Sequence, residues 1–162
     1  MSHSEDAWKI LQQNHDLIKV ADAKAAAIVT GNGVLGGVLL KVLPPHGEWS
    51  AAWPHVTLLL VGVAAVATSI LFALRVFIPR LSNDRPRSLL YFGTIARRFT
   101  DPSEFVTEYR KLLNDATKFE KALAEQVWTT SHIARRKFRN VSPAIWLLGF
   151  ALINALAAGV LR

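Results

Sequence analysis

The chain has 162 residues, of which 51% are hydrophobic and 19% are charged, and its mean hydropathy is +0.25. This composition is too apolar for an ordinary soluble domain. Because the sequence holds no cysteine, disulfides, zinc–thiolate sites and cysteine nucleophiles are excluded. The five histidines lack the i, i+4 spacing that places two imidazoles on one metal ion, so we expect no metal site and no cofactor.

The distribution of charge indicates the fold class. Three windows, 25–43, 56–74 and 141–161, contain Lys41 as their only charged residue. Each window is long enough to cross a bilayer as a helix. We therefore predict an all-α integral membrane protein with three transmembrane helices. Three spans leave about 100 residues for polar segments, which excludes a large catalytic domain but allows one small cytoplasmic helical module.

The predicted segments follow one another along the chain. They are a cytoplasmic amphipathic helix at 1–24, a transmembrane helix at 25–43, an external loop at 44–55, a second transmembrane helix at 56–78, a cytoplasmic helical region at 79–140 and a third transmembrane helix at 141–161.

The first helix is predicted to start near Ser4, with acidic residues in its first turn. Its apolar residues recur on one helical face: Ala7, Ile10, Leu11, Leu17, Ile18, Ala21 and Ala25. Asn14 interrupts this face. No Gly or Pro precedes Gly31, so we expect one continuous helix that passes from the cytoplasm into the membrane and ends at Pro44 and Pro45.

The orientation is predicted from the basic residues, which gather near one end of each span. They are Lys9, Lys19, Lys24, Arg75, Arg80, Arg85, Arg87, Arg135, Arg136, Lys137 and Arg139. The 44–55 loop has no Lys or Arg. The positive-inside rule then places the N-terminus inside and the C-terminus, with Arg162, outside. Topology and anionic lipid account for the net charge of +7, so we expect no nucleic-acid partner.

The segment between the second and third spans is predicted to be helical after a short linker. The linker holds Pro79, Asn83, Asp84 and Pro86, and a short helical stretch follows at 88–99. Asp101 as N-cap and Pro102 at the first helical position form a strong start signal. The apolar stripe behind this signal is Phe105, Tyr109, Leu112, Leu113, Ala116, Phe119 and Leu123.

Two outcomes are open for the end of this helix. It either breaks at Asn114 and Asp115 or runs on to the third span. At the span, Ser142 and Pro143 would either begin a new helix or kink the existing one.

Small and amide residues in the spans favour helix packing. The letters Gly31-Asn32-Gly33 begin a G-x-G-x-x-G pattern, but a dinucleotide site needs a strand before it, and here the pattern lies inside a span. The candidate packing and assembly residues are Asn32, Gly33, Gly37, Ala151, Asn154, Ala155 and Gly159. The two amides fall near mid-bilayer, where they are expected to face protein rather than lipid, as interhelical contacts or in a pore.

Polar residues at the membrane entrance have two possible roles. They can be solvated charges with a Lys19–Asp22 ion pair at i, i+3. They can also border a pocket between the first helix and residues 102–140, where a cation binds a phosphate and Asn14 reads a base edge. The candidate ligand-binding residues are Asn14, Lys19, Asp22, Lys24, Arg97 and Arg98.

The sequence resembles a known family over nearly its whole length. The resemblance rests on the stretch 14–26, which reads NHDLIKVADAKAA and enters a glycine-rich span, on Tyr91-Phe92-Gly93, and on Lys137-Phe138 before the last span. These stretches look like the transmembrane effectors of Pycsar antiphage systems. The resemblance implies a bacterial inner-membrane protein that responds to cyclic UMP or cyclic CMP, made by a partner pyrimidine cyclase, by impairing the membrane and arresting growth.

Two other functions remain open. One is a constitutive membrane adaptor that assembles a partner complex without a ligand. The other is a membrane enzyme, but the sequence has no recognisable nucleophile, base or metal motif, and we expect no catalytic residue. Because three spans make a poor pore, permeabilisation of the bilayer would require an oligomer or the disordering of lipid, and we expect a homo-oligomer.

Overall fold

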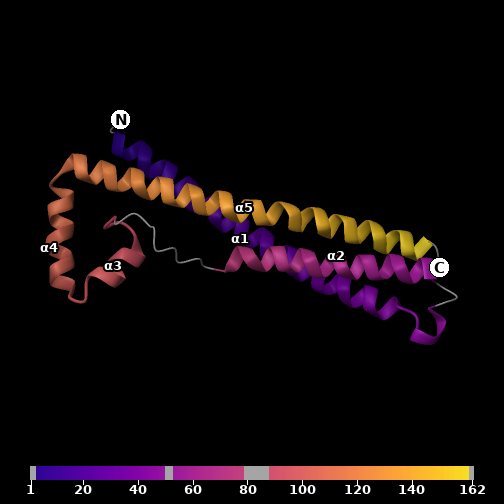
Figure 1. Ribbon diagram of the computed structural model, residues 1–162. Coiled ribbons are helices and arrows are strands. Elements are labelled where there is room, and N and C mark those ends of the chain that lie inside the picture. The colour runs from indigo at the N-terminus through magenta and orange to yellow at the C-terminus, as the bar shows by residue number, and fades with distance from the viewer. Residues whose placement is uncertain (1–2, 50–52, 79–87, 161–162) are drawn as a thin grey trace. The chain divides into compact units, whose positions relative to one another are not determined.

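The protein is described here from a computed structural model that covers residues 3–49, 53–78 and 88–160. Its elements are α1 (His3–Val42), the single 3-10 turn η1 (His46–Glu48), α2 (Trp53–Phe77), α3 (Phe92–Arg98), α4 (Pro102–Leu113) and α5 (Ala116–Val160) (Figure 1). These ranges contain no strand, so the all-α prediction is confirmed for them. The predicted linker residues Pro79, Asn83, Asp84 and Pro86 lie outside the described residues, as do Arg80, Arg85, Arg87 and Arg162.

Three of the helices are long and apolar enough to cross a membrane, namely α1, α2 and α5. The continuous first helix is confirmed, because α1 runs unbroken through its glycines and ends two residues before Pro44. The break at Asn114 and Asp115 is also confirmed, since α4 ends at Leu113 and α5 begins at Ala116. The predicted alternative in which a new helix begins at Ser142 is wrong, because α5 continues through Pro143.

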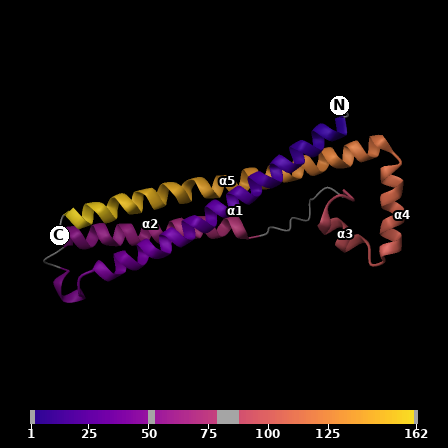
Figure 2. The same ribbon diagram turned by 180° about the vertical axis from the view of Figure 1, so that it is seen from behind.

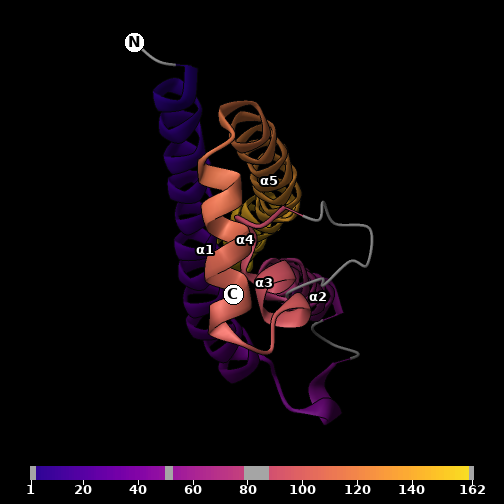
Figure 3. The same ribbon diagram turned by 90° about the vertical axis from the view of Figure 1, so that its left-hand side faces the viewer.

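The chain divides into two compact units, and α1 and α5 contribute residues to both. Unit 1 comprises Met1–Lys19 and Arg80–Arg135, and unit 2 comprises Val20–Pro79 and Arg136–Arg162. Within unit 2, α1, α2 and α5 lie side by side along their lengths (Figure 1, Figure 2). Within unit 1, α3 lies beside α4, as Figure 3 shows.

The core of unit 2 is built from residues that recur at alternating spacings of three and four, and half of them are Gly, Ala or Ser. On α1 they are Ala21, Ala25, Ile28, Asn32, Leu35 and Leu39; on α2 they are Leu59, Gly62, Val66, Ser69, Ala73 and Val76; on α5 they are Val141, Ala144, Leu148, Ala151, Ala155 and Ala158. This 3.5-residue period is typical of helices that pack as a left-handed coiled coil. At the positions that hold Gly, Ala or Ser, the backbones can approach closely.

The same narrow seam corrects the predicted apolar face of α1. Ile10 and Leu17 are each 46% exposed, whereas Asn14 is buried. A strict 3.5-residue seam is narrower than the wide apolar face that we expected, so it passes through Leu11, Asn14 and Ile18 and leaves the flanking apolar residues outside. Asn14 therefore lies on the packed face rather than interrupting it.

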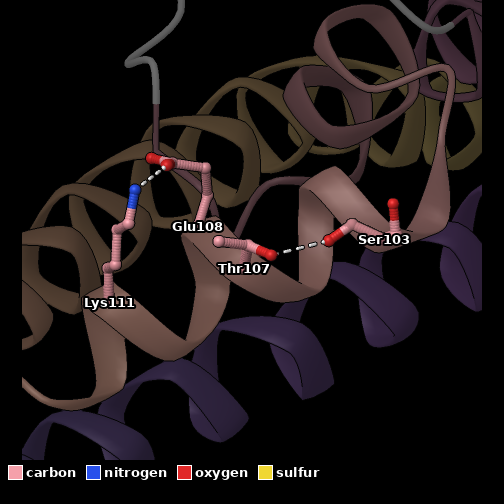
Figure 4. A network of polar contacts seen from close by, with 4 residues as sticks. All are labelled: Ser103, Thr107, Glu108 and Lys111. Atoms are coloured by element: carbon pink, nitrogen blue, oxygen red, sulfur yellow. Dashed lines mark hydrogen bonds and ion pairs between the residues drawn. The ribbon is translucent and has the colours of Figure 1, made fainter.

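The N-terminus of α4 forms as the sequence predicts. Asp101 Oδ1 accepts a hydrogen bond from the backbone N–H of Ser103 at 3.3 Å, and Pro102 occupies the first turn. Further along α4, Thr107 Oγ1 donates to the carbonyl of Ser103 at 3.0 Å, and Lys111 Nζ lies 2.8 Å from Glu108 Oε1 (Figure 4). The ring of Phe105 stacks on Tyr109 and meets Phe99 edge-on, with both pairs of centroids 5.5 Å apart. The cap and these rings fix α4 against the end of α3.

We expect the Asp101 cap to make the stability of unit 1 depend on pH. Hydrogen bonds from Ser103 hold the pKa of Asp101 below its ordinary value of 3.8. The folded state therefore binds this proton less tightly than the unfolded chain does, so the contribution to stability is present above pH 3.8 and is lost as the pH falls through the folded pKa. Melting temperatures should be lower for Asp101→Ala than for wild type at neutral pH, and the difference should shrink in acid.

Asp101→Asn is the matched control for this prediction, because asparagine caps a helix without titrating in this range. Asp101→Asn should keep most of the stability that wild type has at neutral pH. Its stability should not show the decrease in acid that is due to the Asp101 carboxylate. A difference between wild type and Asp101→Ala that stays constant down to strong acid would contradict the assigned role of the carboxylate.

Candidate functional site

A buried amide in unit 1, that of Asn14, makes three hydrogen bonds. Its side-chain nitrogen donates to the carbonyl of Val127 at 3.2 Å, to Thr130 Oγ1 at 3.1 Å and to Ser131 Oγ at 2.8 Å. All three acceptors belong to α5, and the Asn14 side chain is only 8% exposed. The amide nitrogen thus joins α1 to α5 within unit 1 and is no longer available to a ligand.

A second buried amide, that of Gln126, lies on α5 one turn before Thr130. Thr130 Oγ1 donates to the backbone carbonyl of Gln126 at 3.0 Å, and the side-chain oxygen of Gln126 finds no donor among the described residues. A buried oxygen without a donor costs about 1–3 kcal/mol. We call Asn14, Gln126, Thr130 and Ser131 the unit 1 polar cluster. The cluster offers one unused acceptor, the side-chain oxygen of Gln126. Gln126 could not be identified from the sequence because its burial depends on the seam.

The basic candidates of unit 1 lie at the surface. Lys19 is exposed and its Nζ lies 3.2 Å from Asp16 Oδ1. Arg97 and Arg98 occupy the last turn of α3, where both are exposed, and the Arg98 guanidinium lies 5.2 Å from the ring centroid of Phe99. These three cations are therefore accessible to an anion.

At the start of the membrane helices, the structure corrects the predicted Lys19–Asp22 pair. Asp22 instead forms an ion pair with Lys137 of α5 within unit 2, with side chains that are 36% and 21% exposed. The reason is geometric: Asp22 follows the seam residue Ala21, so its carboxylate reaches α5 instead of its own helix. Lys24 is exposed, and its Nζ lies 5.8 Å from the ring centroid of Phe138. From the sequence, Lys137 is predicted only to be one of the basic residues that set the topology.

Deeper in unit 2, a chain of hydrogen bonds connects three helices. Asn32 Nδ2 donates to the carbonyl of Ile28 at 2.9 Å and to Ser69 Oγ of α2 at 2.8 Å. Ser69 Oγ in turn donates to the carbonyl of Ala144 of α5 at 2.7 Å. We call Asn32, Ser69 and Ala144 the mid-span relay. Asn32 and Ser69 are 0% exposed, and no described residue donates to Asn32 Oδ1.

The other packing candidates are distributed unevenly. Asn154 is buried, and its amide nitrogen donates to the carbonyl of Phe150 on its own helix at 3.0 Å. Ala151 and Ala155 lie in the packed seam of α5. By contrast, a Cβ atom built at Gly33, Gly37 or Gly159 would meet no described atom within 4 Å.

Two other glycines make the close helix contacts within the chain. A Cβ at Gly36 would lie 3.2 Å from Val66 Cγ1, and one at Gly62 would lie 3.3 Å from Leu39 Cδ1. Gly33 and Gly37 therefore present an open face, and their role in contacts between copies stays a prediction.

These features define a class: an all-helical membrane protein with three candidate spans and buried polar side chains in both of its units. Among the residues that the structure describes, no group of three His, Asp or Glu residues could hold a metal ion. The family model of the Pycsar effector protein domain matches residues 6–162. The chain belongs to this family.

Two curated relatives agree with this assignment. The chain is 26% identical over 170 residues to the Pycsar effector protein PtPycTM of Propioniciclava tarda, a match that covers 99% of this chain and 81% of the relative. It is 50% identical over 50 residues to the Pycsar effector protein MePycTM of Micromonospora echinofusca, which covers 31% of this chain and 85% of the relative. No solved structure matches the chain significantly.

Proposed function

We propose that this protein is a multi-pass effector of the bacterial inner membrane in antiphage defence, which senses cyclic UMP or cyclic CMP through unit 1 and impairs membrane integrity through unit 2. The observation that carries the proposal is that α1 and α5 each contribute a buried polar residue to unit 1 and a membrane helix to unit 2. A ligand that changes the contact between α1 and α5 in unit 1 thereby acts on two of the three spans.

The unit 1 polar cluster supplies the recognition chemistry in this proposal. Uracil and cytosine both carry ring or amino N–H groups, and the oxygen of Gln126 is an acceptor that no described residue uses. Because the amide nitrogen of Asn14 is already hydrogen-bonded to α5, we assign base recognition to Gln126. Lys19, Arg97 and Arg98 are exposed cations available to the single phosphate. Asp22 and Lys24 belong to unit 2, so we assign them to transmission rather than to ligand contact.

The membrane response requires more than one chain. Three spans are too few to enclose a water-filled pore, so permeabilisation involves several copies or disordered lipid. The open Gly33 and Gly37 face of α1 is available for such contacts. The functional partner in this scheme is a pyrimidine nucleotide cyclase, which supplies the ligand after infection.

A thermal-shift experiment tests the sensing step. The detergent-purified chain is heated with cyclic UMP, cyclic CMP, cyclic AMP or cyclic GMP, alongside the variant Gln126→Leu. One of the pyrimidine ligands, at about 100 times its Kd, should stabilise the wild type by about 2.7 kcal/mol. Gln126→Leu should fold and lose that shift. No shift with any of the four would contradict the proposal and favour a constitutive membrane adaptor.

The orientation of the chain is a separate prediction. Because basic residues avoid the 44–55 loop and gather elsewhere, a reporter fused after Gly47 should be active outside the cytoplasm and one fused after Asn114 inside. Protease accessibility of the same fusions in spheroplasts checks the result independently. The opposite pattern would place unit 1 away from a cytoplasmic ligand and would overturn the sensing proposal.

A further inference from the structure

In the mid-span relay, Ser69 stabilises the packed helices, whereas the side-chain oxygen of Asn32 destabilises them. The Ser69 hydroxyl accepts a hydrogen bond from Asn32 of α1 and donates one to the carbonyl of Ala144, and the second bond holds α2 to α5. The Asn32 oxygen is fully buried and lacks a donor within the described chain. Leucine would fill a membrane core at lower cost than this amide. Asn32 therefore raises the free energy of the packed arrangement.

The relay reaches α5 beside a weak point. Pro143 has no N–H, so the carbonyl of Arg139 loses its normal partner four residues on, and a proline inside a helix allows a bend there. Ser69 holds the peptide of Ala144, directly after the proline. Asp22 forms an ion pair with Lys137, which lies six residues before Pro143. Within unit 2, α5 is thus fixed to its neighbours on both sides of Pro143.

We propose that Asn32 and Ser69 form a polar switch, in which Ser69 holds α5 closed at Pro143 and the buried oxygen of Asn32 favours an open arrangement that admits water. On opening, the Asn32 nitrogen exchanges Ser69 for water, and its oxygen gains a donor that the closed bundle does not provide. The amide thus gains one hydrogen bond when the helices separate. This inference rests on the proposed function, because it assigns the residues that set the threshold of the membrane response.

The switch makes opposite predictions for its two members. Asn32→Leu should close the bundle more firmly, whereas Ser69→Ala should loosen it. The controls are Thr30, two residues before Asn32, and Thr68, directly before Ser69. Both are exposed, and their hydroxyls donate to the carbonyls of Ala26 and Ala64 on their own helices. Thr30→Val and Thr68→Val each remove a hydroxyl from the same helix without touching the relay.

The experiment uses the full chain in liposomes loaded with a self-quenched dye, titrated with cyclic UMP and cyclic CMP. Asn32→Leu should raise the ligand concentration for half-maximal leakage by about tenfold or abolish leakage, while its melting temperature rises; tenfold corresponds to about 1.4 kcal/mol. Ser69→Ala should leak without ligand or need about tenfold less of it. Thr30→Val and Thr68→Val should match the wild type.

Several outcomes would overturn the switch. An Asn32→Leu variant with a wild-type response would do so, and so would a Ser69→Ala variant that needs more ligand than wild type. A smaller oligomer for Asn32→Leu in crosslinking would show instead that the amide acts between copies. If the wild type does not leak with either nucleotide, the proposed function fails. In that case, leakage of Ser69→Ala without ligand would still support the switch, provided that the double variant Ser69→Ala/Asn32→Leu does not leak. If Ser69→Ala does not leak without ligand, the switch is wrong.

Discussion

Reversal of one charge in the Asp22–Lys137 pair should destabilise the protein, and reversal of both should restore much of the loss. Either single reversal, Asp22→Lys or Lys137→Asp, places two like charges in contact between α1 and α5. The side chains are only 36% and 21% exposed, so solvent screens them incompletely. We expect each single variant to lose about 1–3 kcal/mol, less than the roughly 3–5 kcal/mol typical of fully buried pairs.

A double-mutant cycle measures this interaction directly. Unfolding is followed in detergent for the wild type, both single variants and the doubly reversed chain. The coupling energy is the change in unfolding free energy of the doubly reversed chain minus the sum of the changes in the two single variants. The control is Asp6–Lys9, an exposed pair 3.7 Å apart, for which reversal should change stability by less than about 0.5 kcal/mol. A doubly reversed chain as unstable as the sum of its singles would contradict a specific contact between Asp22 and Lys137.

The same variants separate packing from topology. Lys137 also belongs to the basic group that flanks the third span, so Lys137→Asp alone weakens the charge signal for orientation. The doubly reversed chain keeps the net charge of the pair unchanged while the lysine moves to α1. Recovery of ligand-dependent membrane depolarisation in that chain therefore reports on the ion pair rather than on the total charge.

The three spans and the cap of α4 could be predicted from the sequence because both depend on local properties. A charge in the bilayer core is expensive wherever it sits, so the apolar windows identify α1, α2 and α5 without knowledge of their partners. The cap at Asp101 needs only the residues that follow it within one turn.

The contacts between helices could not be predicted because they depend on register. Lys137 lies 115 residues after Asp22, and nothing local to either residue indicates that they meet. The glycines show the same limit: Gly33 and Gly37 have the spacing of a packing motif, yet Gly36 makes the close approach to α2. Which side of a helix meets a neighbour follows from a 3.5-residue seam shared by α1, α2 and α5, and that seam becomes recognisable only when the partner helices are known.

The second large effect should come from Asn14→Asp, which changes a buried donor into an acceptor of almost the same shape. Asn14 faces the carbonyl of Val127 and the hydroxyls of Thr130 and Ser131, and both hydroxyls already donate to the backbone of α5. A carboxylate at this position meets oxygen lone pairs and loses its hydration. We expect Asn14→Asp to cost about 2–4 kcal/mol of unfolding free energy at neutral pH.

The pH dependence of this variant distinguishes a buried charge from a general packing defect. Burial raises the pKa of the new carboxyl above the value of about 3.9 that it has in an unfolded chain. The folded state then binds the proton more tightly, so stability should rise as the pH falls from neutral through the folded pKa. Gln13→Glu adds the same charge at the exposed neighbouring position and should change little. If Asn14→Asp matched the wild type at every pH, the amide of Asn14 would not be the contact that holds α1 to α5 in unit 1, and Gln126 would lose its place in a ligand site built on that contact.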